Sequence, residues 1–140
     1  MFAKHRFDVG NVIGPQFEIK LKDNNVFIKH CPIIFKGEKA VHMKGQLGGL
    51  LKYKMIREST GKTSICSRAF LVKKPGEDKW RLVIDYRELN DVTIKDSYPI
   101  PNINEITRRM SGKKVFTTLD IRAGYHHFQI KEEDKWKTSF

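Results

Sequence analysis

The sequence predicts an α+β fold, and three features of its apolar patterning indicate this class. Two apolar runs, 69–72 and 82–84, flank a Pro-Gly turn, which is the pattern of a β-hairpin over about 68–86. From about 38 to 56 the apolar residues recur with the period of an α-helix. A β-rich run at 115–121 predicts a further strand.

The segment before the hairpin combines an extended part with the helix. Phe17–Leu21 alternates apolar and polar side chains, which predicts a strand with one buried face. After the turn residues Asp23–Asn25, Val26–Ile28 is placed to pair back against that strand. Three glycines within 38–56 weaken the predicted helix by about 1 kcal/mol each against alanine. Four apolar residues share one face of this helix: Met43, Leu47, Leu50 and Leu51.

The elements after the hairpin follow from cap and turn residues. Asn102 or Asn104 can cap a short helix over about 102–110, and Gly112 ends it. The strand at 115–121 comes next. Beyond it the sequence predicts a tight turn, a strand, a solvated acidic turn and another strand, at Gly124, Phe128–Ile130, Glu132–Asp134 and Thr138–Phe140.

The composition favours a soluble protein with a polyanionic partner. The 140 residues include 27 Lys and Arg against 16 Asp and Glu, for a formal charge of +11. Nucleic acid suits this charge because each neutralised phosphate releases counterions, although an anionic membrane, an acidic protein or a merely soluble basic surface fits the charge alone. No apolar run approaches the roughly 20 residues of a membrane span. The N-terminus lacks the apolar core of a secretory signal, so we expect an intracellular protein, cytoplasmic or nuclear, without a membrane partner.

Two possible sites are excluded by spacing. Cys31 and Cys66 form no Cys-x-x-Cys pair, so we expect free thiols and no zinc site. The tripeptide 61–63, Gly-Lys-Thr, resembles the end of a phosphate-binding loop. That motif needs a glycine five residues before Gly61, and position 56 is isoleucine.

A carboxylate followed by a turn is the feature that suggests chemistry. Asp120 stands near the end of the last β-rich run, where a sheet would fix it, and the N–H groups of Ala123 and Gly124 can face phosphate oxygens. Lys74 and Arg81 can supply the positive charge that a triphosphate needs during phosphoryl transfer. The alternative is that the carboxylate only ends a strand and both cations are solvated.

Five sequence blocks follow one another through the second half of the chain: Ala69–Lys74, Trp80–Asn90, Tyr98–Pro101, Phe116–His126 and Lys137–Phe140. In this order and spacing they resemble the opening of the reverse transcriptase domain of gypsy-type LTR retrotransposons, and retroviral reverse transcriptases share the order. The resemblance covers about residues 67–140, and it is much weaker over residues 1–60.

The resemblance implies the fingers and the first part of the palm of a right-hand polymerase, truncated before the catalytic Asp-Asp hairpin. Residues 1–60 would be a lead-in segment with a connecting helix, and residues 61–140 the N-terminal part of the reverse transcriptase domain, with the fingers hairpin at 68–86 and a palm strand at 115–121. The complete domain would use two magnesium ions and a dNTP. Its partners would be an RNA or DNA template-primer and the remainder of the polymerase and ribonuclease H in the parent polyprotein.

The same resemblance implies roles for individual residues. Asp120 corresponds to the first catalytic, metal-binding aspartate, and the carbonyl of Ile121 would be a further metal ligand. The Tyr125 ring would clash with a 2′-hydroxyl and so favour deoxynucleotides. The dNTP-binding set is Lys74, Arg81, Ala123, Gly124 and Tyr125, and the template-binding set is Asp85, Arg87 and Asn90.

The sequence also departs from the family pattern. Ala123 stands where retroviral enzymes carry a second acidic residue, as is usual in the gypsy type. Gly48, Gly49 and Cys66 are irregular and suggest a decaying copy. Because a two-metal reaction needs carboxylates on both ions, we expect this chain alone to be inactive. The alternatives are a non-catalytic, basic nucleic-acid-binding remnant of a retroelement and a basic fold without a present function.

Overall fold

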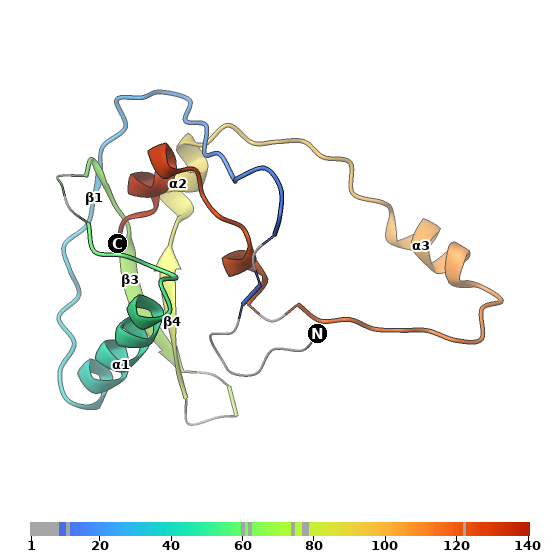
Figure 1. Ribbon diagram of the computed structural model, residues 1–140, viewed down its shortest axis with the longest axis horizontal. Coiled ribbons are helices and arrows are strands. Elements are labelled where there is room, and N and C mark those ends of the chain that lie inside the picture. The colour runs from blue at the N-terminus through green and yellow to red at the C-terminus, as the bar shows by residue number, and fades with distance from the viewer. Residues whose placement is uncertain are drawn as a thin grey trace.

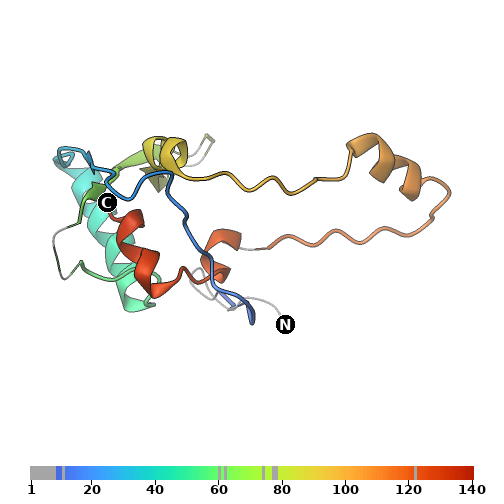
Figure 2. The same cartoon turned by 90° about the horizontal axis from the view of Figure 1, so that it is seen from above.

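The computed structural model describes residues 9–10, 12–59, 61, 63–73, 75–76, 79–121 and 123–140. A compact body holds both termini of this part of the chain, and a long arm extends from it (Figures 1 and 2). The mixture of helices and strands confirms the predicted α+β class. The elements in chain order are β1 (Ile28–Lys29), α1 (Glu38–Lys52), β2 (Ile65–Cys66), β3 (Arg68–Lys73), β4 (Trp80–Asp85), α2 (Arg87–Val92), α3 (Ile103–Met110), and the 3-10 helices η1 (Gly124–His127) and η2 (Glu132–Thr138).

The predicted hairpin is present. Strands β3 and β4 pair antiparallel, with a register that runs from Arg68 opposite Asp85 to Lys73 opposite Trp80. This agrees with the prediction over 68–86, because the two apolar runs face each other across the pair. Helix α1 lies beside this hairpin (Figure 1).

Helix α1 begins at Glu38 as predicted, but it ends at Lys52 rather than near residue 56. The backbone reverses at Lys54, whose φ of 55° is in the left-handed region. There the N–H of Met55 donates to the carbonyl of Leu50 at 2.9 Å, which is the bond pattern of a Schellman motif. The helix stops because this motif satisfies its last carbonyls. Of the predicted apolar face, Met43 is buried.

The hydrophobic core is formed by elements distant in sequence. The prediction that Val26–Ile28 pairs back across its turn is wrong. Instead Ile28 pairs in parallel with Ile65, and β1 and β2 form a two-stranded sheet. Ile28 and Ile65 are buried with Leu89 of α2. Ile28 pairs with Ile65 rather than with its neighbours in sequence because this pairing buries both side chains against Leu89 of α2.

Two other predicted strands are reduced to single bridges. Within Phe17–Leu21, Phe17 forms a parallel bridge with Ile130 and Leu21 an antiparallel bridge with Thr93. The segment is therefore extended, but no continuous strand runs beside it among the described residues. The strand predicted at Phe128–Ile130 is likewise present only as the bridge at Ile130.

The C-terminal stretch differs most from its prediction. The solvated turn expected at Glu132–Asp134, and the start of the strand expected at 138–140, form the single 3-10 helix η2. Asp134 is only 4% exposed. Its carboxylate accepts hydrogen bonds from Lys137 and from the backbone N–H of Ile19. These charge-assisted bonds offset the free-energy cost of burying the carboxylate. The sequence pattern predicted a solvated turn here instead.

The arm consists of residues 94–121 and carries α3 at its far end (Figures 1 and 2). Helix α3 agrees with the prediction, including the cap, since the Asn102 side chain accepts a hydrogen bond from the Asn104 N–H at 2.9 Å. The predicted strand at 115–121 is wrong for this chain: these residues are extended but unpaired, and every one is exposed. A strand needs a neighbour to accept its backbone hydrogen bonds, and no described residue pairs with this segment.

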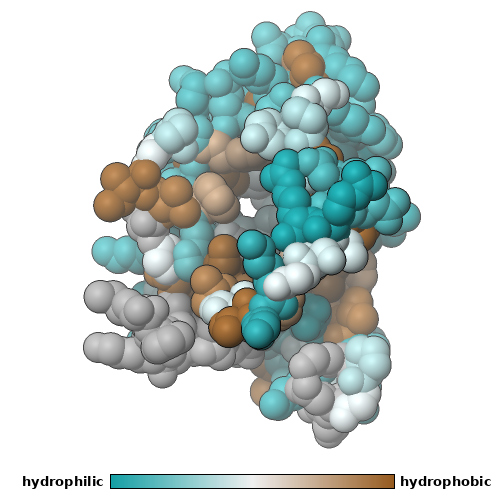
Figure 3. Space-filling view, turned by 90° about the vertical axis from the view of Figure 1, so that its right-hand side faces the viewer, coloured by the Kyte–Doolittle hydropathy of each residue, from teal (hydrophilic) through white to brown (hydrophobic). Residues whose placement is uncertain are grey.

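The arm exposes apolar side chains. Val115 and Leu119 are each 85% exposed, although both are strong strand formers. Figure 3, which views the molecule from the side of the arm, shows apolar side chains in brown among the polar ones on this face. None of the helices within the described ranges is both long and apolar enough to span a membrane. Cys31 and Cys66 are free thiols, as predicted.

Candidate functional site

Arg81 lies near the turn end of the hairpin, as the second residue of β4. It lies on β4, where it pairs with Val72 of β3, and its side chain is exposed. Within the described part of the chain, no carboxylate lies within ion-pair distance of its guanidinium. The arginine is thus held by a paired strand while its charge stays available to an anion. Lys74, the other predicted triphosphate-binding cation, lies outside the described residues.

The predicted template-binding residues lie at the end of β4 and on α2. Asp85 is the last residue of β4, and its carboxylate accepts two hydrogen bonds from the Arg87 guanidinium, at 2.8 Å from Nε and 2.5 Å from Nη2. These bonds lower the pKa of Asp85 to about 2. Asn90 follows Arg87 by three residues on α2, so the two share one side of that helix. The structure therefore brings all three together.

Tyr86 anchors the start of α2 to the C-terminal part of the chain. Its hydroxyl donates to the carbonyl of Thr138 at 2.9 Å, and burial raises the pKa of this tyrosine to about 12. Helix α2 itself was not predicted. The sequence signal that could have predicted it is Asp85, an aspartate just before the helix. Its carboxylate accepts the Arg87 N–H at 3.2 Å in an Asx turn, and such turns commonly precede helices.

The turn after Asp120 contains the second group of predicted residues. Asp120 and Ile121 are exposed at the end of the arm. Ala123 has a φ of 50°, in the left-handed region, and its carbonyl accepts the N–H of His126 at 2.9 Å. This reversal starts η1, which carries Gly124 and the 96% exposed Tyr125.

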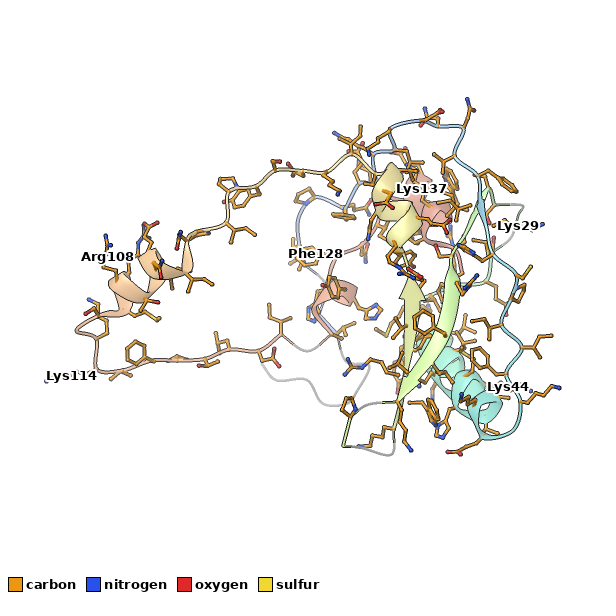
Figure 4. All side chains as sticks on the ribbon, turned by 180° about the vertical axis from the view of Figure 1, so that it is seen from behind. Lys29, Lys44, Arg108, Lys114, Phe128 and Lys137 are labelled. Atoms are coloured by element: carbon orange, nitrogen blue, oxygen red, sulfur yellow. The ribbon has the colours of Figure 1, made fainter. Side chains whose placement is uncertain are left out.

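An open, mostly apolar pocket lies against this turn. Its volume is about 410 Å³, and its lining includes three of the predicted residues together with three that the sequence did not single out: Ile121, Gly124 and Tyr125, with Val12, His127 and Phe128. Figure 4 labels Phe128 at η1, between the hairpin and the arm. The Val12 N–H donates to the His127 carbonyl at 3.0 Å, so the N-terminal segment closes one side. No local signal could have predicted Val12, because it reaches the site by tertiary contact.

Partial burial changes the pKa of His126, which lies beside the pocket residue His127 in the sequence. Burial, assisted by the adjacent His127, lowers the pKa of His126. The imidazole of His126 therefore favours its neutral form more than a free histidine does.

The predicted residues form two groups rather than one. Arg81, Asp85, Arg87 and Asn90 are continuous along β4 and α2, while Asp120 to Tyr125 are continuous along the arm and η1. Along the long axis of the molecule, η1 lies between the hairpin and α3 (Figures 1 and 2). In the part of the chain that the structure describes, no hydrogen bond or ion pair joins Asp120 to Arg81.

The oxygen atoms near Asp120 fit a magnesium ion only in part. The Asp120 carboxylate and the Ile121 carbonyl are the kind of oxygen ligands that magnesium prefers. Among the described residues, however, no three His, Cys, Asp or Glu side chains gather into a metal-binding cluster. A two-metal centre needs carboxylates on both ions, and these residues supply one. The described residues therefore supply only part of a two-metal site.

Comparison with known proteins gives one matching family model and several similar polyproteins. Residues 72–140 match the family model described as reverse transcriptase (RNA-dependent DNA polymerase). The chain is 38% identical over 119 residues to the retrovirus-related Pol polyprotein from transposon 297 of Drosophila melanogaster, a match that covers 82% of this chain and 11% of that protein. It is 44% identical over 96 residues to the Pol polyprotein from the Drosophila transposon gypsy, covering 65% of this chain and 9% of the relative.

A solved structure shares the fold. The crystal structure of a prototype foamy virus protease–reverse transcriptase mutant superposes with a TM-score of 0.75 at 22% identity, covering 96% of this chain and 18% of that one. At this identity the likeness supports the fold alone, and it agrees with the predicted arrangement of fingers and early palm. The chain spans about a tenth of the length of the curated relatives it matches, with shares of 11% and 9% in the two Drosophila polyproteins.

Proposed function

We infer that this chain, whose residues 72–140 belong to the reverse transcriptase family, is the fingers and early-palm segment of an RNA-directed DNA polymerase from an LTR retrotransposon. The observation that carries the proposal is the apolar pocket lined by Ile121, Gly124 and Tyr125, directly after the exposed Asp120 carboxylate. An acid beside an apolar pocket suits a nucleotide, whose sugar and base need apolar contact and whose phosphates need a metal ligand close by.

In this proposal the hairpin binds the triphosphate. Arg81 neutralises phosphate charge, and Lys74, the residue that follows β3 in the sequence, assists it. Guanidinium groups suit phosphate oxygens because their N–H donors are fixed in a planar fork. Ala123 and Gly124 offer backbone N–H groups to phosphate oxygens from the turn after Asp120.

Asp120 and the Ile121 carbonyl would hold magnesium, with a second carboxylate set from the remainder of the palm. Magnesium would stabilise the developing charge on the transferred phosphoryl group. The Tyr125 ring excludes a 2′-hydroxyl and so selects deoxynucleotides. Asp85, Arg87 and Asn90 contact the template strand.

The wider assignments follow from the same proposal. Residues 1–60 are the lead-in segment, and residues 61–140 are the N-terminal part of the polymerase domain. The partners are an RNA or DNA template-primer and the rest of the polymerase and ribonuclease H. The place of action is intracellular, in the cytoplasm or the nucleus.

Primer extension by a chimaera tests this function. Residues 72–140 would replace the matching segment of the transposon 297 polymerase, and extension with deoxynucleotides would be measured. Asp120→Asn should abolish extension while primer-template binding persists, because a neutral amide is a poor magnesium ligand. Tyr125→Ala should raise ribonucleotide incorporation. Asp96→Asn, which neutralises an exposed carboxylate elsewhere on the arm, is the matched control and should leave extension unchanged.

Two results would count against the proposal. One is an Asp120→Asn chimaera that extends primers as well as its parent. The other is primer extension by the purified 140-residue chain, because proximity and orientation can supply about 7–11 kcal/mol of a barrier and the chain alone lacks the groups that provide them.

A second function, non-catalytic nucleic-acid binding, is favoured by the charge distribution. The formal charge is +11, and the basic residues labelled in Figure 4 lie at both ends of the molecule, with Lys44 on α1 and Arg108 and Lys114 on the arm. Such a surface contacts phosphates without reading sequence. Binding that persists in Asp120→Asn, without extension in any version of the protein, would identify this function.

A further inference from the structure

The side chain of Gln46 on α1 bonds to the two peptide groups on either side of Arg81. Its Nε2 donates to the carbonyl of Trp80 at 2.7 Å, and its Oε1 accepts the N–H of Leu82 at 2.9 Å. Both bonds have ordinary lengths and are partly buried. Gln46 is the only link of this kind that the described residues of α1 make to β4 through side-chain hydrogen bonds.

The arrangement reproduces one step of a β-ladder. Along a strand, the N–H and C=O groups of alternate residues point to the same edge. Those of Trp80 and Leu82 therefore point away from β3, whereas Arg81 pairs with Val72 on the β3 side. A primary amide offers one donor side and one acceptor side, as a neighbouring strand does. Gln46 thus takes the place of a strand partner at this one position.

Two further residues of α1 help to fix the orientation of Trp80 and therefore of Arg81. Lys39, Met43 and Gln46 are spaced four and three residues apart, so they share one face of the helix. Met43 is buried, and the Lys39 ammonium lies 5.1 Å from the centroid of the Trp80 ring. Trp80 therefore turns toward α1. Because side chains alternate along a strand, Arg81 projects from the opposite face.

We propose that Gln46 is a positioning residue for Arg81, and that its amide fixes the strand backbone from which the guanidinium reaches the triphosphate of a nucleotide. This proposal rests on the proposed function of Arg81. The direction of a side chain follows from the peptide planes on either side of its Cα, and here both planes are held, by β3 on one edge and by Gln46 on the other. An arginine held in this way loses less conformational entropy when it binds phosphate.

The test uses the full 140-residue chain and dTTP in the presence of magnesium. Nuclear magnetic resonance would follow the Arg81 Nε–H signal during titration, and amide hydrogen exchange would be measured at Leu82. Gln46→Met keeps the length of the side chain and a good helix former, but it removes both hydrogen bonds. We expect faster exchange at Leu82 and dTTP affinity about 3- to 10-fold weaker, which corresponds to the entropy cost of ordering one long side chain on binding.

Two further variants separate positioning from folding. Gln46→Glu keeps the acceptor for the Leu82 N–H and loses the donor to Trp80, so exchange at Leu82 should return toward the parent value. Gln16→Met removes an exposed glutamine outside the site, and it should change neither measurement. Circular dichroism should show the same helix content in all variants.

The outcomes distinguish the positioning role from the proposed function. Arg81→Ala should weaken dTTP binding at least as much as Gln46→Met. If Arg81→Ala has no effect on dTTP affinity, the proposed function of Arg81 fails, and the positioning role fails with it. If Arg81→Ala weakens binding and Gln46→Met speeds exchange at Leu82 without weakening binding, Gln46 is only structural. Unchanged exchange in Gln46→Met would show that the two bonds do not hold the strand.

Discussion

The Asp134 carboxylate and the Lys137 ammonium lie 2.5 Å apart, and together they bind both polar groups of one residue, Ile19. The N–H of Ile19 donates to Asp134 Oδ2 at 2.8 Å, and its carbonyl accepts from Lys137 Nζ at 2.6 Å. The two side chains are 6% and 13% exposed. An ion pair on η2 therefore replaces the strand partner that the N-terminal segment lacks at this residue.

Asp134→Ala should be strongly destabilising. It leaves the Lys137 ammonium buried without its partner and frees the Ile19 N–H, and breaking a buried pair in this way costs about 3–5 kcal/mol. Urea unfolding should show the loss as a lower midpoint. Glu133→Ala is the matched control, because Glu133 is exposed and lies 4.0 Å from Lys131, so its removal should change stability by less than about 1 kcal/mol.

The same pair should make stability depend on acid. Burial raises the pKa of Asp134, but hydrogen bonds from Lys137 and Ile19 outweigh it, and the pKa lies below its ordinary value of 3.8. A carboxylate with a lowered folded-state pKa stabilises the fold above its unfolded pKa, and this stabilisation is lost as the pH falls through the folded value. The free energy of unfolding should therefore fall as the pH drops below about 4.

Asp134→Asn should flatten that acid dependence. Unfolding curves at several pH values would measure the slope for the parent, for Asp134→Asn and for Asp96→Asn, in which an exposed carboxylate is neutralised. An equal slope in the parent and in Asp134→Asn would contradict the assignment to this residue.

The sequence was sufficient wherever a structure depends on local signals. The hairpin at β3–β4 and the Asn102 cap of α3 follow from apolar runs, a Pro-Gly turn and a capping side chain, and all are present. The predictions at 17–21 and 115–121 failed for a common reason. Each segment has strand-like alternation, but a strand also requires a partner, and partners are set by tertiary contacts that the pattern does not contain.

The candidate site shows the same division. The block around Asp120 was identified from its residues, and the turn at Ala123 places Gly124 and Tyr125 at the pocket. Gln46 was not identified, because a glutamine on a helix carries no signal that it will bond to a strand 34 residues later. Residues that act through backbone groups elsewhere are visible only once the fold is known.

Lys54→Gly should stabilise the end of α1. A lysine at a φ of 55° carries the steric cost of the left-handed region, roughly 1–2 kcal/mol, which glycine does not. Because glycine also loses more entropy on folding, we expect a net gain of about 0.5–1 kcal/mol in thermal or urea unfolding. Lys52→Gly, two residues earlier with ordinary helical geometry, should instead lower stability. A loss of stability in Lys54→Gly would mean that the Schellman motif does not form.

Releasing Arg87 should strengthen nucleic-acid binding. Asp85 now engages this guanidinium through two hydrogen bonds, although the arginine side chain is 86% exposed. Asp85→Asn weakens that pairing, so binding of a single-stranded oligonucleotide should tighten, and the slope of log affinity against log salt should steepen by about 1. Asp91→Asn, on the same helix, makes the same charge change without freeing Arg87. Equal effects of the two variants would assign the gain to net charge alone.

The exposed arm should make the isolated chain associate with itself. Val115 and Leu119 lie on one face of the extended segment, and the backbone groups beside them have no partner among the described residues. An unpaired apolar edge of this kind is a template for pairing with another chain.

Sedimentation velocity and binding of an apolar dye would measure this association. We expect oligomers to form as the concentration rises to about 100 μM. Val115→Lys with Leu119→Lys should reduce both signals, because two charges on the edge oppose pairing. The far-UV circular dichroism spectrum of the chain should stay unchanged, since the hairpin and α1 lie outside the arm. The matched control is Ile13→Lys with Val41→Lys, which adds the same charge at apolar residues that are 99% and 71% exposed but lie outside the arm. If this control suppresses association as well as the arm variant does, net charge rather than the arm governs it. A parent chain that stays monomeric throughout would show that its exposed apolar face does not template pairing.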